Sequence, residues 1–332
     1  MQHSILAIIL AFIIVIILGP IIIPVLSKLK FGQMIREDGP RSHLKKAGTP
    51  TMGGILMLIS LILVTFLLTR GSNNLMLAAL LVTLGYGIIG FIDDFIKIVR
   101  KRSLGLRAYQ KLIGQIGIAA IFAYYVYTNS IIGSSVYIPF TDTQVDLGIM
   151  YIPITVFIIV GTVNSVNLTD GLDGLAAGVT TVVAATFTLI CLAYSLLLLD
   201  SGQLYYGNEL SNVGIFAGAL TGACLGFLRF NSNPAQVFMG DTGSLALGGA
   251  VASIAIVMKL QFFLPIMGGI YVIETLSVIL QVAYFKLTGK RMFRMSPIHH
   301  HFELKGLREN KVVTLFVIAT IILCLITILA LN

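Results

Sequence analysis

Residues 5–26 read ILAIILAFIIVIILGPIIIPVL, an apolar run without a charged side chain. A helix needs about 20 apolar residues to cross the hydrocarbon core of a bilayer, so this run predicts a membrane span. It lacks the basic start and the small-residue cleavage site of a signal peptide, and Gly19-Pro20 interrupts it. We therefore interpret it as a first span that the protein retains.

Similar apolar windows recur along the chain and leave no polar stretch long enough for a soluble domain. Of the 332 residues, 57% are hydrophobic and 11% are charged, whereas soluble globular chains carry about a quarter charged residues. We predict an all-α polytopic membrane protein of about ten transmembrane helices, forming one integral membrane domain over residues 1–332. The expected spans are 4–27, 51–69, 75–96, 110–129, 149–166, 175–199, 211–229, 243–259, 263–286 and 311–331.

The basic side chains indicate the orientation of these spans. All Lys and Arg residues except Arg70 and Lys259 fall in loops or at helix ends on one side of the predicted bundle. The positive-inside rule places that side in the cytoplasm and both termini outside. The net charge of +8 can suggest nucleic acid, but these bases lie in short loops beside the membrane. We therefore expect an electrostatic role at the membrane surface and no nucleic-acid partner.

On the other side, residues 130–148 read SIIGSSVYIPFTDTQVDLG. Two short β-prone runs flank a polar Thr-Asp-Thr turn, which predicts a small outer hairpin. An irregular loop is the open alternative.

Acidic side chains are costly near hydrocarbon, so their positions in a membrane protein are informative. Most of the 14 acids lie in the predicted cytoplasmic loops or at the cytoplasmic ends of spans, and three groups of them stand apart. The acids on this side are Glu37, Asp38, Asp93, Asp94, Asp170, Asp173, Asp241, Glu303 and Glu309.

The first group is Asp93-Asp94, within GYGIIGFIDDFIKIVRKR at residues 85–102. These acids follow an apolar span and precede a basic run. Adjacent residues of a helix point about 100° apart, so they need not share one partner. A structural pair neutralised by Lys97 and Arg100 is the alternative.

The second group is NSVNLTDGLDGLAAG, residues 164–178. Asp170 and Asp173 are three positions apart, so on a helix they would share a face. Ordinary N-capping needs only one polar side chain, whereas Asn164 and Asn167 add two more here. These polar side chains exceed what capping needs, which predicts a binding role.

The third group is RFNSNPAQVFMGDTGSLALGG, residues 229–249, in which Asp241 stands at the mouth of a span. A helix that begins there would offer free backbone N–H groups and a positive dipole end to a phosphate. A plain Asp cap with a glycine-rich bend is the alternative.

Three acid groups at one membrane level, facing basic loops, are typical of a divalent cation bound to a phosphorylated ligand. Mg²⁺ prefers carboxylate and phosphate oxygens, and no Cys or His spacing favours zinc. The loop SPIHHHFELKG, residues 296–306, adds three consecutive histidines. They can form a metal site, donate to phosphate or position an acid.

With these motifs assembled, the chain resembles the phospho-MurNAc-pentapeptide transferases, which make lipid I in bacterial peptidoglycan synthesis, and the likeness covers essentially the whole length. Its acid motifs resemble the wider superfamily of polyprenyl-phosphate sugar-phosphate transferases. The stretches KKAGTPTMGG (45–54) and PIHHHFE (297–303) point to this branch. The other matching stretches are Asp93-Asp94, KLIGQ (111–115), NLTDGLDGL (167–175), FMGDTGSLALGG (238–249) and ETLSVILQV (274–282).

The resemblance implies a Mg²⁺-dependent enzyme of the bacterial cytoplasmic (plasma) membrane, with its active-site cleft facing the cytoplasm. UDP-MurNAc-pentapeptide would give its phospho-sugar to undecaprenyl phosphate, a membrane lipid, and UMP would be released. The resemblance also implies a homodimer.

The same resemblance assigns roles to residues. It places the metal on Asp241, makes Asp93 the candidate base with Asp94 in support, and matches His299 to the catalytic histidine. Whether Asp93 removes a proton or attacks the pyrophosphate is left open. The second pKa of a phosphate is about 6, so near pH 7 most molecules of the lipid phosphate have already lost the proton that a base would remove. We expect a single direct displacement. Matches to substrate contacts are Lys46, Lys97, Lys101, Lys111, Asn167, Asp170, Asp173, Asn231, Phe238, His300 and His301.

Glu274 lies inside an apolar window, at ~1.5 Å per residue about 18 Å from its cytoplasmic end. We expect it near the middle of the membrane, hydrogen-bonded to a neighbouring helix, with Gly268-Gly269 bending the helix before it.

Three other functions compete. A sister transferase for GlcNAc-1-phosphate would carry similar acids, and the histidine loop separates the two. A cation transporter would spread its acids in depth along facing helices. A lipid-binding scaffold without chemistry would not need so many acids in one place.

Overall fold

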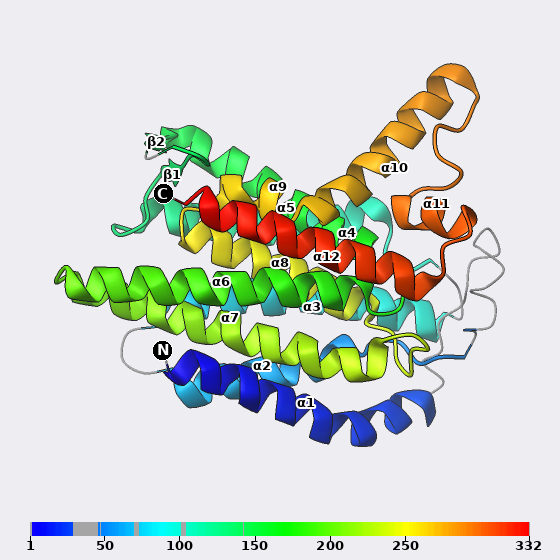
Figure 1. The fold of residues 1–332 in the computed structure, drawn as a ribbon, viewed down its shortest axis with the longest axis horizontal. Helices are drawn as coiled ribbons and strands as arrows, with labels where there is room; N and C mark the ends of the chain where they lie inside the picture. The colour runs from blue at the N-terminus through cyan, green and yellow to red at the C-terminus, as the bar shows by residue number, and fades with distance from the viewer. Residues whose placement is uncertain are drawn as a thin grey trace.

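A computed structural model describes residues 2–28, 46, 48–69, 73–100, 104–141 and 143–331 (Figure 1). The described chain is a helical bundle with one short antiparallel strand pair. Its helices are α1 (Gln2–Lys28), α2 (Gly54–Leu68), α3 (Asn74–Val99), α4 (Ala108–Thr128), α5 (Tyr151–Thr169), α6 (Leu175–Asp200), α7 (Leu204–Asn231), α8 (Gly240–Val257), α9 (Leu264–Met267), α10 (Gly269–Thr288), α11 (Ile298–Leu304) and α12 (Glu309–Leu329). The strands are β1 (Ser135–Tyr137) and β2 (Gln144–Asp146), and the short 3₁₀ helices are η2 (Gly148–Met150) and η3 (Gln261–Phe263).

Eight of the described helices are long and apolar enough to cross a membrane: α1, α3, α5 with η2, α6, α7, α8, α10 and α12. The predicted all-α membrane architecture is thus confirmed in its class. Two expected spans differ from these eight. The window 51–69 is helical only over the 15 residues of α2, and the 21-residue α4 carries Gln110, Lys111 and Gln115 in its first half.

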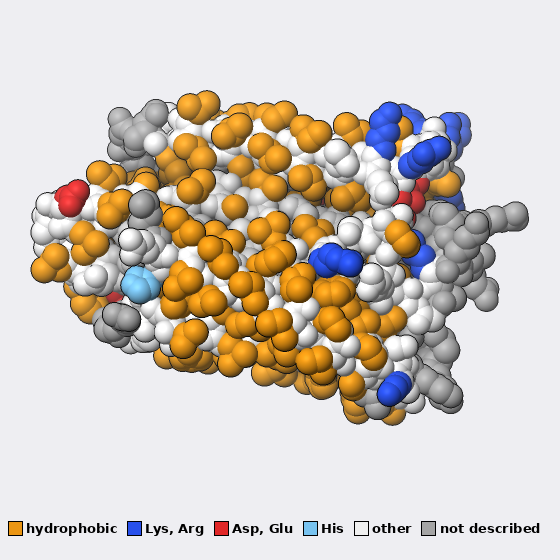
Figure 2. Space-filling model, turned by 60° about the horizontal axis from the view of Figure 1, so that its bottom comes forward, with side chains coloured by type: hydrophobic (Ala, Val, Ile, Leu, Met, Phe, Trp, Pro, Cys, Tyr) orange, Lys and Arg blue, Asp and Glu red, His pale blue; other side chains and the backbone are white. Residues whose placement is uncertain are grey.

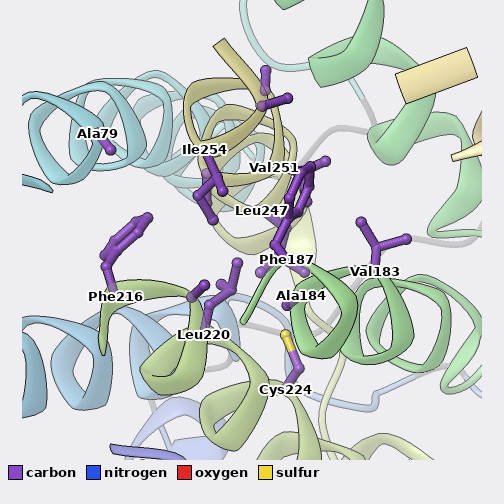
Figure 3. Close-up of a cluster of buried hydrophobic side chains, with 14 of the residues drawn as sticks. Ala79, Val183, Ala184, Phe187, Phe216, Leu220, Cys224, Leu247, Val251 and Ile254 are labelled. Carbon is purple, nitrogen blue, oxygen red and sulfur yellow. The ribbon is translucent and has the colours of Figure 1, made fainter. Parts of the chain in front are cut away.

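The core lies around α8, which is buried along almost its whole length. Helices α3 and α5 pack on α8, and α6 pairs with α7, which also contacts α1 and α2. Figure 3 shows side chains of α3, α6, α7 and α8 meeting in this core, among them Phe187, Phe216 and Leu247. Small residues such as Ala79 and Ala184 let the helices approach closely, as is common in membrane bundles.

The polar and charged groups are divided between the two ends of the bundle. Both chain termini and the strand pair lie at one end, and α11 lies at the other (Figure 1). Strands β1 and β2 pair antiparallel, with Val136 opposite Val145. They lie in the segment predicted to form a small outer hairpin, and we call this strand pair the hairpin. Figure 2 shows a broad hydrophobic band, with most Lys and Arg side chains of that face at the end opposite the hairpin.

The helical path is interrupted at Gly268, where α9 ends and α10 begins. A bend at this point was predicted from the glycine pair. Helix α10 then leaves the bundle (Figure 1), and most side chains of its second half are exposed, including Phe285 and Leu287. The loop after α10 returns to the bundle through the short helix α11, which carries the histidines.

Candidate active site

The close approach of α3 and α8 gathers three carboxylates. Gly90 of α3 faces the backbone of α8, where a Cβ would collide with the carbonyl oxygen of Asp241. Asp93 and Asp94 follow one turn later on α3, and Asp241 is in the first turn of α8. Ligand oxygens of these three acids all lie within 4.8 Å of one another. We call Asp93, Asp94 and Asp241 the acid cluster.

Asp94 is bound to the N-terminus of α8. Its Oδ2 accepts hydrogen bonds from the backbone N–H of Thr242 at 2.9 Å and from the Thr242 hydroxyl at 2.8 Å, and its Oδ1 accepts one from the N–H of Asp241 at 3.2 Å. The expectation that α8 offers these N–H groups to a phosphate is therefore wrong. A carboxylate from α3 satisfies them, as a side-chain cap from another helix.

Two lysines neutralise much of the acid cluster. The ammonium of Lys97 lies 2.6 Å from Oδ2 of Asp93 and 3.1 Å from Oδ2 of Asp241. Lys111 of α4 lies 2.9 Å from the same Asp241 oxygen. Three carboxylates against two ammonium groups leave a net negative charge. The alternative in which Asp93 and Asp94 form an isolated structural pair is therefore too simple, since Asp241 shares their lysine.

The remaining oxygens of the cluster are held by neutral donors. Oδ1 of Asp241 accepts a hydrogen bond of 2.9 Å from Asn167, which also donates to Ser244. Oδ1 of Asp93 accepts the backbone N–H of Leu106 at 2.8 Å. The structure thus joins Asn167, Lys97 and Lys111, which were predicted as substrate contacts, to the acid cluster. Lys101 lies outside the described residues.

Asp170 and Asp173 do not share a helix face, and that expectation is wrong. Helix α5 ends at Thr169 and α6 begins at Leu175, so both acids lie in the turn between them. The glycines of this turn end one helix before the next begins. The two carboxylates therefore serve different neighbours.

The charges of the acid cluster affect the pKa of Asp170. Burial, followed by the charges of Asp241, Asp94 and Asp173, raises the pKa of Asp170 to about 8. An aspartate in an unfolded chain titrates near 4 (roughly 3.9). The folded protein therefore holds this proton across a pH range in which the unfolded chain has lost it. The stability contributed is full below about pH 4 and is lost as the pH rises towards about 8.

We accordingly expect the thermal midpoint of the protein in EDTA to fall between pH 6 and pH 8, and Asp170→Asn to reduce that fall because asparagine cannot ionise. The measurement is thermal unfolding of both proteins across this range in one detergent. Asp146→Asn is the control, since this acid lies in the hairpin. A slope that is the same in the wild type and in Asp170→Asn would contradict the assignment.

Asp173 belongs to a second polar group, with Lys46, Asn233 and Glu309. The Lys46 ammonium lies 2.6 Å from Oδ1 of Asp173 and 2.7 Å from Oε1 of Glu309. Asn233 donates to both carboxylates, at 3.1 Å and 2.9 Å. Lys46 and Asp173 were predicted as site residues, whereas no role was predicted for Asn233 or Glu309. The signal for Asn233 was its place in the segment 229–249, and that for Glu309 was its place among the acids on the basic side.

Asn231 and Phe238 hold the loop between α7 and α8. The buried Asn231 amide accepts the N–H of Gly174 at 3.0 Å and donates to the carbonyl of Val237 at 2.9 Å. The Phe238 backbone pairs with Pro50 and Gly53 in the segment before α2. This loop thereby joins the 170–174 turn to the segment that carries Lys46.

The three histidines of α11 have different partners. The buried His299 places Nδ1 3.0 Å from Oε2 of Glu274. His300 pairs its Nδ1 with Glu303 at 2.8 Å, and Nδ1 of His301 accepts the backbone N–H of Arg294 at 3.1 Å. Nδ1 of His301 therefore carries no proton. Burial, then Lys305 and Arg294, also lowers the pKa of His301, which favours the neutral ring.

Glu274 was expected to make a hydrogen bond to a neighbouring helix, and it does. The neighbouring helix is α11, and the partner is His299, the predicted catalytic histidine. Helix α11 lies beside the start of α10, which then leaves the bundle (Figure 1). The depth of Glu274 near the middle of the membrane stays a prediction.

Comparisons with known proteins show the family of this chain. Glycosyl transferase family 4 matches residues 76–259, and the phospho-N-acetylmuramoyl-pentapeptide-transferase signature 1 matches residues 46–58. Proteins named phospho-N-acetylmuramoyl-pentapeptide-transferase are similar over nearly their full length. The one from Clostridium kluyveri is 50% identical over 100% of both chains. Those from Clostridioides difficile and Geobacillus sp. are 52% and 54% identical, over 97% and 95% of this chain and 95% and 94% of their own.

The chain belongs to the phospho-N-acetylmuramoyl-pentapeptide-transferase family. The resemblance seen in its motifs is thus confirmed, and the protein is a multi-pass bacterial membrane transferase that moves a phospho-sugar group.

The two matched regions fall on the described site. The span 76–259 contains the acid cluster and the 170–174 turn. The signature of the phospho-N-acetylmuramoyl-pentapeptide-transferase family begins at Lys46 and runs into α2. It includes Gly53, just before α2, which pairs with Phe238. The histidines of α11 lie outside both regions and join the site through His299.

Proposed function

We propose that this protein transfers phospho-MurNAc-pentapeptide from UDP-MurNAc-pentapeptide to undecaprenyl phosphate, giving lipid I and UMP. The observation that carries the proposal is the acid cluster, whose oxygens lie within 4.8 Å of one another at the basic end of an apolar bundle. A charged donor and a lipid acceptor must meet at such a place. The relatives' names supply the sugar and the peptide.

The donor set of the cluster fits Mg²⁺. All its ligand atoms are carboxylate oxygens, and the net charge of the acids with Lys97 and Lys111 is negative. Both oxygens of Asp94 already accept hydrogen bonds from the start of α8, so Asp241 and Asp93 would hold the ion. Binding of the ion would replace one of the contacts that these two acids make with lysines. Mg²⁺ supplies charge neutralisation for the pyrophosphate of the donor.

The protein's own side chains then position the two substrates. Lys97 and Lys111 already stand beside the cluster and can bind phosphate oxygens once they leave Asp241. Asp93 has both oxygens engaged, one by Leu106 and one by Lys97. Because the lipid phosphate is already mostly ionised near neutral pH, Asp93 seldom has a proton to remove and would act mainly by helping Asp241 to hold the ion. We retain a single displacement. Phosphorylation of Asp93 by the nucleotide donor alone would overturn it.

The remaining parts of the proposal concern the membrane. In it the chain crosses the membrane about ten times, with both termini outside and the acid cluster facing the cytoplasm. The concentration of Lys and Arg at the end opposite the hairpin (Figure 2) supports that orientation. The proposed assembly is a homodimer. Lys46, Lys101, Asn231, Phe238, His300 and His301 remain proposed substrate contacts, together with Asp170 and Asp173.

A two-donor assay tests the proposal. The purified protein is given undecaprenyl phosphate with either UDP-MurNAc-pentapeptide or UDP-GlcNAc, with Mg²⁺ or with EDTA. We expect UMP release and a lipid-linked product only with the MurNAc donor and Mg²⁺. Turnover of UDP-GlcNAc alone would favour the sister transferase, and failure with both donors would reject the transferase mechanism.

A further inference from the structure

Glu274 and His299 form a buried pair beside the site. Neither side chain has exposed surface, and their 3.0 Å contact joins α10 to α11. Among the described residues, the other two polar atoms of the pair, Oε1 of Glu274 and Nε2 of His299, have no hydrogen-bond partner. A buried polar atom without a partner costs stability, so its retention points to a use.

The free nitrogen faces the site. Gly171, directly after Asp170, lies against the His299 ring, and a Cβ at this position would collide with Nε2. The ring therefore sits where a side chain of the 170–174 turn would otherwise be. Asp170 in the same turn senses the charges of Asp241 and Asp94. Nε2 of His299 thus points to the turn that borders the acid cluster.

We propose that Glu274 is a positioning residue that holds the proton of His299 on Nδ1 and so presents Nε2 as a bare, basic nitrogen to the substrate. This inference rests on the proposed function. A buried carboxylate needs a donor, and an Nδ1–H group supplies a charge-assisted bond. Nε2 then has the lone pair and can accept the proton that a minority of lipid phosphates still carry near neutral pH, while Glu274 stabilises the imidazolium that results.

The opposite arrangement makes a different prediction. If Glu274 carried the proton and donated it to Nδ1, Nε2 would be an N–H donor facing Gly171. The two arrangements share the same heavy-atom positions, and they differ in which ring nitrogen is protonated. A measurement on the ring nitrogens therefore separates them without any substrate.

The experiment uses ¹⁵N-histidine-labelled full-length protein in lipid nanodiscs, with the His299 signals assigned from a His299→Asn sample. Wild type is expected to show a protonated Nδ1 and an unprotonated Nε2. Glu274→Leu is expected to release the proton from Nδ1, because leucine offers no acceptor, and to give a mixture of the two tautomers. Glu274→Asp is expected to keep it on Nδ1. A protonated Nε2 in wild type, or an unchanged tautomer in Glu274→Leu, would overturn the proposal.

Kinetics provide the second measurement. Glu274→Gln is expected to lower kcat by about 100-fold, with little change in KM for the nucleotide donor, and Glu274→Asp to restore part of the rate. Thr275→Val is the matched control, because Thr275 neighbours Glu274 but bonds to Ser165 at 2.7 Å. It should retain wild-type kcat. Wild-type kcat in Glu274→Gln would refute the positioning role. If wild type itself turns over neither donor, the proposed function fails, while the tautomer result still stands.

Discussion

Replacing Asp241 by asparagine is expected to lower Mg²⁺-dependent UMP release by about 10³-fold or more. Oδ2 of Asp241 lies 3.1 Å from the Lys97 ammonium and 2.9 Å from that of Lys111. Asparagine has nearly the same shape but no charge. It therefore removes the strongest proposed metal ligand and leaves two lysines without their shared counterion.

The measurement is UMP release from UDP-MurNAc-pentapeptide at several Mg²⁺ concentrations, with thermal unfolding to establish that the variant is folded. Asp200→Asn is the matched control, since Asp200 is an exposed acid at the C-terminus of α6. It should keep wild-type activity. Wild-type UMP release by a folded Asp241→Asn variant would remove Asp241 from the metal site and with it the main support for the mechanism.

The membrane fold was the part best predicted from the sequence. Lipid as a solvent requires long apolar helices, so windows such as 175–199 predicted α6 almost to its ends. Prediction was weaker where polar residues enter a span, as in α4, and where a span is short, as in α2. Hydropathy measures the side chains of one segment and not the neighbours that cover them.

Several of the residues that the structure brings together were singled out from the sequence, but their partners were not predicted. Asp241 is far along the chain from Asp93 and Asp94, and only the packing of α3 on α8 brings it to them. The three-residue spacing of Asp170 and Asp173 was misleading, because it assumes a helix that a glycine turn interrupts. The hydrogen bond of Glu274 to a neighbouring helix was predicted, but its partner was not. The fold of α10 and α11, which brings His299 beside Glu274, cannot be predicted from one segment.

Substituting Gly90 by alanine is expected to weaken both the fold and the activity. A Cβ at Gly90 would overlap the backbone of Asp241 and Thr242, which has no alternative rotamer. Helices α3 and α8 would have to separate, and the bonds from Asp94 to the start of α8 would lengthen. Overpacking of this kind costs roughly 1–3 kcal/mol. A displacement of about 1 Å at an active site can cost about 10²-fold in rate, so we expect a lower thermal midpoint and UMP release reduced by that order.

Gly117→Ala is the matched control, because Gly117 also lies inside a helix, α4, and a Cβ there meets nothing within 4 Å. Alanine favours a helix interior over glycine by about 0.5–1 kcal/mol, so this variant should be as stable as wild type or more so, with full activity. Each variant adds one methyl group, and the difference between them isolates the contact of α3 with α8. Equal thermal midpoints and equal rates would mean that Gly90 does not determine this contact, and that the acid cluster is assembled by other interactions.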